Sequence, residues 1–193
     1  MKKLLLILLC LPMIGFGQKT YVPCDAFESF LESLGYGDFQ SNDSVYTDSI
    51  RSILDLDIVD NFGGPAILYC SNLIGIEDFD SLKTIIIGGN VNNIDLSNNH
   101  NLINVHIRYN DSLVNLDITN LSNLTFLKLS SSGGNSTMPL NSIDLSTNTS
   151  LEYLQISCSF WPQTLGFPNQ NPCHFDDGTV SLTQLDISNN FNL

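Results

Sequence analysis

Apolar residues recur in pairs along most of the chain, and one polar residue separates the two members of every pair except Ile85/Ile87, which flank Ile86. Between residues 94 and 129 these pairs follow one another at a spacing of eleven residues. Such short alternation of apolar and polar residues is typical of a strand with one buried side. The pattern predicts nine short strands, centred on Leu56/Ile58, Ile85/Ile87, Ile94/Leu96, Val105/Ile107, Leu116/Ile118, Leu127/Leu129, Ile143/Leu145, Leu154/Ile156 and Leu185/Ile187.

An isolated eleven-residue unit cannot bury its own apolar edge, so neighbouring units have to cover one another. We therefore expect a β-rich repeat solenoid, right-handed and built from short parallel strands. The cores at residues 94, 105, 116 and 127 should stack consecutively with their apolar side chains inside. An array of amphipathic helices is excluded, because β-branched cores at this spacing and repeated Asn-Asn turns do not suit helices.

The polar residue in the middle of each strand alternates in type. From residue 94 onward, aspartate occupies this place in four strands, at Asp95, Asp117, Asp144 and Asp186. His106, Lys128 and Gln155 occupy it in intervening strands, so successive strands are predicted to lie on two different sides. On one side Asp95, Asp117 and Asp144 would form a carboxylate ladder. Its repulsion is offset either by nearby hydroxyl and amide donors, which we favour, or by a bound divalent cation.

Asparagine recurs three positions after the last apolar residue of four strands, at Asn99, Asn110, Asn148 and Asn190. We predict that these side chains are buried and that their amides satisfy backbone groups in tight turns. Asparagine also tolerates unusual backbone dihedrals in such turns.

Residues 25–34 carry the one clear helical pattern. Four apolar residues share one face, at Phe27, Phe30, Leu31 and Leu34. Asp25 and Glu28 resemble a capping box, and Gly35 supplies a stop. We predict that this helix covers the open end of the first repeat, within an N-terminal cap at 18–50 that precedes repeats at 51–193.

The repeats, together with TYVPCDAFESFLESLGYGD at 20–38 and LIGIEDFDSL at 73–82, resemble a known family. They are similar to the short-period leucine-rich repeats of secreted flavobacterial-type proteins, often labelled internalin-like. Cys24 departs from the family, which more often has aspartate there. The resemblance implies a leucine-rich repeat solenoid with a helical cap, as the N-terminal part of a type IX secreted surface protein. It implies no single biochemical activity.

Residues 1–17 have the pattern of a secretory signal peptide. Two lysines precede an apolar run over residues 4–14, and Gly-Phe-Gly at 15–17 provides a cleavage site before Gln18. The run is too short to span a membrane comfortably. We predict a secreted or cell-surface location without membrane insertion, and the alternative of lipidation at Cys10 stays open.

The chain is strongly acidic, with a formal net charge of −13 at pH 7. Removal of the signal peptide would take away two of the seven basic residues and none of the twenty acidic ones. Nucleic acid is excluded as a partner, because binding to phosphates needs lysine and arginine. The acidic surface is sufficiently explained by solubility outside the cell.

Four cysteines follow the signal peptide, and an even number in a secreted chain favours disulfides. Cys158 with Cys173 would close a short loop, worth about 3 kcal/mol by chain entropy. Cys24 with Cys70 would join the cap helix to the first repeats. The alternative is free thiols buried in the repeat core.

The longest interruption of the repeat is the insertion at residues 159–179, which contains Trp161, the single tryptophan. Long loops on rigid scaffolds often carry function. We therefore predict Phe160, Trp161 and Phe167 as binding residues, with a Cys158–Cys173 bridge at the base. The alternative is that these rings pack as a small satellite core.

No catalytic constellation is evident, and nothing indicates a cofactor or a metal site. His100, His106 and His174 lack metal-binding spacing, and Asp176 and Asp177 beside His174 are typical of an ordinary turn. We therefore expect a non-catalytic secreted or cell-surface protein that binds a protein or glycan partner, for instance in adhesion.

The alternative function is the N-terminal repeat region of a larger secreted enzyme, with its catalytic domain beyond residue 193. The sequence reaches Leu193 without a cap, so we expect further repeats there. Without them, residues 185–193 should associate or fray.

Overall fold

The first apolar residue of each of the nine predicted pairs lies in a strand of the structure, whereas four second members directly follow the end of a strand: Leu96, Ile118, Leu145 and Ile187. The computed structural model describes residues 17–58, 68–132, 138–158 and 184–193. Its elements in chain order are β1 (Lys19–Tyr21), α2 (Asp25–Ser33), β2 (Ser44–Tyr46), α3 (Thr47–Ile50), β3 (Asp55–Ile58), β4 (Leu68–Asn72), the 3-10 helix η1 (Ile76–Asp78), β5 (Thr84–Asp95), β6 (Asn104–Arg108), β7 (Asn115–Asp117), β8 (Phe126–Ser131), β9 (Ser142–Asp144), β10 (Tyr153–Cys158) and β11 (Gln184–Asp186).

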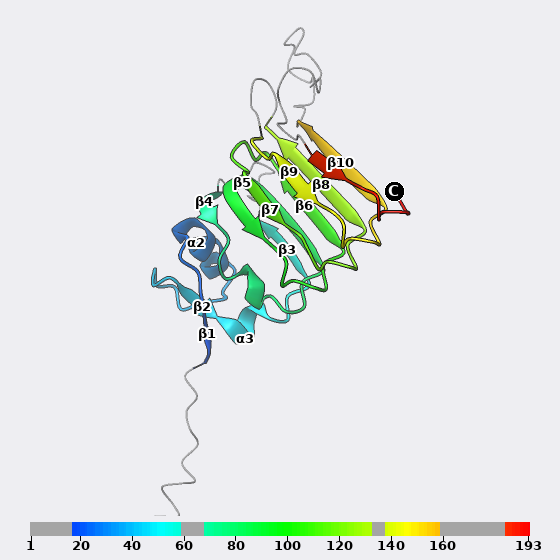
Figure 1. The fold of residues 1–193 in the computed structure, drawn as a ribbon. Coiled ribbons are helices and arrows are strands. Elements are labelled where there is room, and N and C mark those ends of the chain that lie inside the picture. The colour runs from blue at the N-terminus through cyan, green and yellow to red at the C-terminus, as the bar shows by residue number, and fades with distance from the viewer. Residues whose placement is uncertain (1–16, 59–67, 133–137, 159–183) are drawn as a thin grey trace, which may run out of the picture.

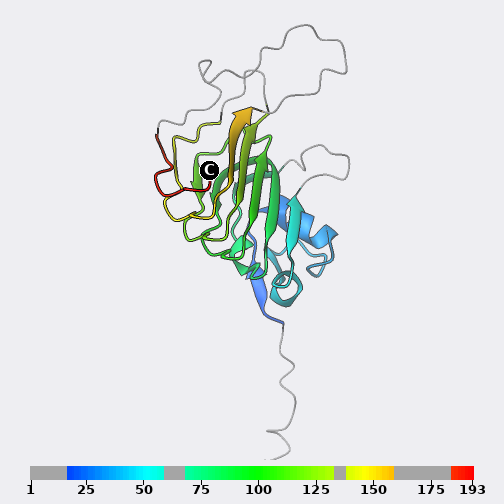
Figure 2. The ribbon, with the colours of Figure 1, turned by 90° about the vertical axis from the view of Figure 1, so that its right-hand side faces the viewer.

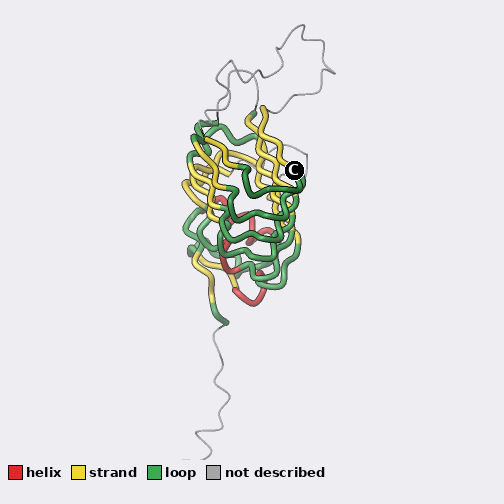
Figure 3. Tube along the Cα trace, turned by 45° about the vertical axis from the view of Figure 1, so that its right-hand side comes forward, coloured by secondary structure: helices red, strands yellow, loops and turns green. Residues whose placement is uncertain are grey.

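The strands that carry the repeat cores pair in parallel. The first sheet has the order β10–β8–β6–β5–β3, and Val105 of β6 pairs with Ile85 of β5 and Leu127 of β8. In the second group, β5 pairs with β4 and β7, β9 lies against β7, and β11 pairs with β9. Figures 1 and 2 show the two groups as layers whose strands run in the same direction, and Figure 3 shows the connecting loops lying one behind another.

Successive units alternate between the two layers. Ile94 pairs with Leu116 in the second group, whereas Val105 pairs with Leu127 in the first sheet. The predicted two-sided arrangement is therefore confirmed. The expectation of one consecutive stack for the cores at 94, 105, 116 and 127 was wrong, because an eleven-residue step carries the chain across to the opposite layer.

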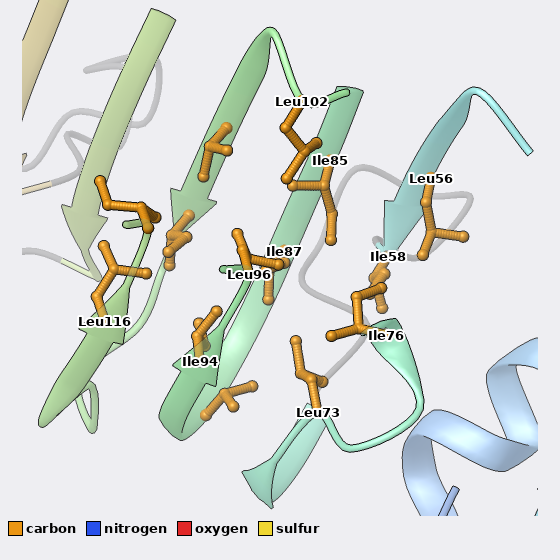
Figure 4. Packing of buried hydrophobic residues seen from close by; sticks show 14 of the residues in the cluster. Leu56, Ile58, Leu73, Ile76, Ile85, Ile87, Ile94, Leu96, Leu102 and Leu116 are labelled. Carbon is orange, nitrogen blue, oxygen red and sulfur yellow. The ribbon is translucent and has the colours of Figure 1, made fainter. Parts of the chain in front are cut away.

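Apolar side chains from both layers form one core between them. Ile85, Ile87, Ile94, Leu127 and Leu129 are fully or almost fully buried, and even Leu116 is only 9% exposed. Figure 4 shows side chains from both layers in this core, among them Leu56 and Ile85 of the first sheet and Ile94 and Leu116 of the second group. Burial of these edges is the stabilising term that makes the repeat cooperative.

Strand β5 belongs to both layers. Its first half pairs with β3 and β6 of the first sheet, and its second half with β4 and β7. Gly88 and Gly89 lie in the middle of this strand, and Gly89 has a φ of 104°. A left-handed φ there suits glycine and turns the strand from one layer into the other, where the sequence predicted two separate strands.

The four asparagines are buried and bond to backbone groups as predicted, but they do not adopt the unusual backbone dihedrals that the sequence suggested. The side-chain amide of Asn99 donates to the Ile76 carbonyl at 2.8 Å, and that of Asn110 to the Val91 carbonyl at 3.0 Å. Asn148 and Asn190 donate in the same way. Unusual backbone dihedrals occur instead at neighbouring turn residues, with φ of 56° at Tyr109 and 64° at Asn120.

Helix α2 packs beside β4, and a disulfide between Cys24 and Cys70 joins the two. The predicted Cys24–Cys70 pair is therefore confirmed. The Cys158–Cys173 disulfide stays a prediction, because Cys173 lies outside the described residues.

The predicted capping box was wrong. Cys24 is the N-cap and makes no side-chain cap bond. The buried Glu28 carboxylate instead accepts hydrogen bonds from the N–H groups of Asn42 and Ser44, both at 2.9 Å. Leu34, expected on the buried face, follows the last helical residue and is 48% exposed.

The described residues contain no helix long and apolar enough to cross a membrane.

Candidate functional site

The predicted aspartates lie side by side on the outer side of the second layer. Asp95 and Asp117 are register partners in β5 and β7, and Asp144 occupies the equivalent place in the adjacent β9. All three are exposed. We call the outer side of β7, β9 and the second half of β5 the aspartate face.

Each of these carboxylates is held by donors two residues further along the chain. Asp95 Oδ1 accepts hydrogen bonds from the N–H (2.9 Å) and the hydroxyl (2.7 Å) of Ser97. Asp117 accepts the same pair from Thr119, and Asp144 accepts the N–H of Ser146 at 2.9 Å. Local donors of the predicted kind therefore fix the position of each charge.

A row of amides runs next to the aspartates. The Asn115 amide donates to the Asn93 side-chain oxygen at 2.6 Å, and the Asn93 amide donates to the Ser71 carbonyl at 3.0 Å. The sequence reasoning did not identify this row. Its signal is asparagine two residues before the aspartate, at positions 93 and 115.

The aspartate face is hollowed. A pocket of about 510 Å³ lies over it, lined by the aspartate and asparagine rows and by the exposed Ile74 and Glu77. Every charged residue of its lining is acidic: Glu77, Asp95, Asp117 and Asp144. The hollow therefore suits polar or cationic ligands with several hydroxyl or amine donors.

Within the part of the chain that the structure describes, no group of three or more His, Cys, Asp or Glu side chains is placed to hold a metal ion. The aspartates stand in a row along neighbouring strands and do not converge on one point.

The outer side of the first sheet has a different chemistry. His106 of β6 is the register partner of Ile86 in β5 and of Lys128 in β8, and Gln155 of β10 extends the row. We call this outer side, across β6, β8, β10 and the first half of β5, the histidine face. Its middle row is half-buried, in contrast to the exposed aspartates.

Burial first, and then the positive charges of Lys128 and Arg108, together lower the pKa of His106 from 6.5 to about 4. A neutral imidazole is less costly to desolvate than an imidazolium. At neutral pH His106 is therefore an uncharged hydrogen-bonding group between two cations.

Aromatic rings flank this row. Phe126 and Tyr153 are register partners, and their rings stack with centroids 4.6 Å apart and planes 2° apart. Arg108 lies over the ring of Tyr109, 5.7 Å from its centroid. The sequence reasoning missed the stacked pair, because the insertion between β8 and β10 places the two rings outside the regular spacing.

The predicted binding residues Phe160, Trp161 and Phe167 lie outside the described residues. Their role as contacts stays a prediction, as does the alternative of a satellite core.

Comparisons with known proteins add little to this geometry. No protein-family model matches the chain, and no curated protein matches it. Among solved structures, the chain is similar to the functional domain of InlJ from Listeria monocytogenes, which includes a cysteine ladder, with a TM-score of 0.43 and 22% sequence identity. The alignment covers 92% of this chain and 46% of that one. InlJ is an internalin-like leucine-rich repeat protein, but a likeness this distant carries no argument about function.

Proposed function

We propose that the chain is a non-catalytic secreted or cell-surface leucine-rich repeat module that binds a protein or glycan partner, built on a right-handed solenoid. The observation that supports this most is the display of polar side chains in register on two opposite sheet faces. Neighbouring strands place these side chains about 4.8 Å apart. Such an array matches ligands that themselves repeat along their length.

The scaffold beneath these faces is suited to binding. The core residues are buried, and local donors or neighbouring strands hold the outward groups. A surface fixed in advance loses little conformational entropy when a partner binds. Two faces of different charge on one scaffold also allow two partners to bind at once.

The finer parts of this proposal rest on the sequence. They are the signal peptide at 1–17, kinship to flavobacterial-type repeat proteins, type IX secretion, and contact through the insertion at 159–179. Export is checked by expressing the chain with residues 1–17 in a Gram-negative host and sequencing the exported protein. We expect its N-terminus at Gln18, whereas retention of the uncleaved chain in the cell would contradict this part.

The binding function is tested with one variant for each face. Asp117→Lys reverses one charge on the aspartate face, and Lys128→Glu reverses one on the histidine face. Both side chains point away from the core, so melting temperatures should stay within a few degrees of the unchanged chain.

The three proteins are screened against an array of glycans and purified surface proteins. We expect a partner of the unchanged chain that one variant binds at least tenfold more weakly and the other binds normally. If every partner binds both variants as well as the unchanged chain, the sheet faces are not the binding surface and the proposal fails.

A further inference from the structure

The cations of the described residues divide into two groups. Lys19 and Arg51, near the N-terminal end, form ion pairs with Asp38 and Asp80, both at 2.8 Å. Lys83, Arg108 and Lys128 form no ion pair with any described residue. Arg108 and Lys128 lie on the adjacent strands β6 and β8, and Lys83 immediately precedes β5. In a chain of net charge −13, unpaired positive charge gathers at the first sheet.

No described anion neutralises these cations. Arg108 Nε is buried and has no hydrogen-bond partner among the described residues. His106 lies between Arg108 on its own strand and Lys128 on the next, and it carries no charge that could compensate them. The acidic residue in the same row is Asp57 of β3. It is exposed, and β5 lies between its strand and that of His106.

Next to the cations lies a surface suited to a sugar ring. Tyr153 belongs to β10, which ends the described first sheet, and the residue is 43% exposed. Phe126 covers one side of this ring by stacking, and no described strand lies beyond the other side. The Tyr153 hydroxyl donates to Gln155 at 2.6 Å, which fixes the orientation of the ring.

We propose that the histidine face binds an acidic polysaccharide of the uronate type. Carboxylates of the sugar chain pair with Lys128 and Arg108, one sugar ring stacks on Tyr153, and His106 hydrogen-bonds to ring hydroxyls. This inference rests on the proposed binding function and names the ligand class for one of the two faces.

A polysaccharide fits this face better than an acidic peptide. Both would satisfy the two cations, but a glutamate-rich segment has no flat ring to cover Tyr153. The combination of cations, a neutral hydrogen-bonding imidazole and an exposed aromatic ring matches a carboxylated sugar, which offers anion, hydroxyls and apolar ring face together.

The test is calorimetric titration of the mature chain with tetragalacturonate. Its methyl ester has the same rings without charge, and tetraglutamate has the same charge without rings. We expect tetragalacturonate to bind at least tenfold more tightly than either, and its affinity to fall with added salt. No binding, equal binding of the methyl ester, or tighter binding of tetraglutamate would each overturn the proposal.

Matched variants locate the site. Lys128→Gln should weaken binding about tenfold, as expected for one charge-assisted hydrogen bond. Lys19→Gln removes the same charge from the N-terminal cap and should bind like the unchanged chain. Tyr153→Ala should also weaken binding, whereas Tyr69→Ala, on the exposed side of β4, should not. Equal losses within either pair would overturn the assignment to this face.

The two levels of proposal fail differently. If tetragalacturonate does not bind but Asp117→Lys abolishes binding of another partner, only this inference is lost. If neither Asp117→Lys nor Lys128→Glu affects any partner, the binding function itself is lost.

Discussion

The side-chain amide of Asn148 donates hydrogen bonds to two backbone carbonyl groups that follow β7, those of Ile118 at 2.9 Å and Leu121 at 3.1 Å. Asn190 donates in turn to the carbonyls of Leu145 and Asn148. Because these groups are buried, no water replaces a lost donor. The asparagines therefore link neighbouring repeat units through their backbones, in addition to the contacts of the apolar core.

Replacing Asn148 by leucine should destabilise the protein. The equivalent place after β7 is occupied by Leu121, which is fully buried, so leucine fits this kind of position. The variant Asn148→Leu leaves the buried Ile118 carbonyl without its side-chain donor, while the Leu121 carbonyl keeps only the N–H of Leu124 at 3.2 Å. We expect a loss of about 1–3 kcal/mol in the free energy of unfolding, measured with urea.

Asn123→Leu provides the control, because the Asn123 amide also donates to a carbonyl of the preceding coil, that of His100, but at an exposed site. Its loss should be clearly smaller. Equal stability of Asn148→Leu and the unchanged chain would show that these hydrogen bonds do not stabilise the fold.

His106 predicts a specific pH dependence of stability. Its pKa in the folded chain is about 4, below the ordinary value of 6.5, owing to burial and to Lys128 and Arg108. Between these values the unfolded chain binds the proton more strongly, so stability is fully present above pH 6.5 and falls as the pH is lowered towards 4.

In the variant His106→Gln this part of the pH dependence disappears. We expect its melting temperature to fall less than that of the unchanged chain between pH 7 and pH 4. The control His100→Gln removes an exposed turn histidine and should follow the unchanged chain. Parallel curves for all three proteins would contradict the assignment.

At the scale of elements, the N-terminal strand β1 meets the 3-10 helix η1 at a glycine. Gly75 has a φ of 102°, and a Cβ there would lie 2.8 Å from Val22 Cγ2 and 2.9 Å from the Tyr21 carbonyl oxygen. The adjoining hydrogen bond from the Thr20 hydroxyl to Asp78, at 2.6 Å, links the same two elements. Close approach of backbones fixes how the cap sits on the first strands.

The variants Gly75→Ala and Gly35→Ala distinguish the energetic cost of a left-handed backbone from the cost of a steric clash at the added Cβ. Gly35 also has a left-handed φ, of 84°, but no atom lies within 4 Å of its added Cβ. We expect Gly35→Ala to cost about 1–2 kcal/mol from backbone strain alone, and Gly75→Ala to cost more. Thermal unfolding of both variants checks this order, and a milder effect at Gly75 would contradict the close packing.

At the scale of the whole molecule, the Cys24–Cys70 disulfide closes a loop with a sequence separation of 46 residues. Chain entropy assigns such a loop about 4 kcal/mol of stability. We expect Cys24→Ala combined with Cys70→Ala to lose most of this amount in urea unfolding. Reductant should destabilise the unchanged chain by about this amount more than it destabilises the double variant, in which only the predicted Cys158–Cys173 bridge is left to reduce. A reductant effect of the same size in both would point to a different bond.

The sequence was sufficient for those features that repeat at a fixed spacing. The strand cores, the two alternating sides, the aspartate row and the buried asparagines all follow from local pattern. Strand β4 carries no repeat pattern, and the stacking of Phe126 on Tyr153 depends on how an insertion resets the register. The hollow over the aspartate face is lined by several segments that are far apart in the sequence, so no short stretch of sequence encodes it.

The alternation between layers restricts how such a chain can change in length through gene duplication. Partners within a layer lie 22 residues apart, as Asn93 and Asn115 do. Duplicating one eleven-residue unit would send every later unit to the opposite layer, so that acidic positions would continue the row of His106 and Lys128. Duplicating two units together leaves both rows continuous. Related chains that keep both polar rows should therefore differ in length by even numbers of eleven-residue units. Selection for the two faces would maintain this rule without acting on any single residue.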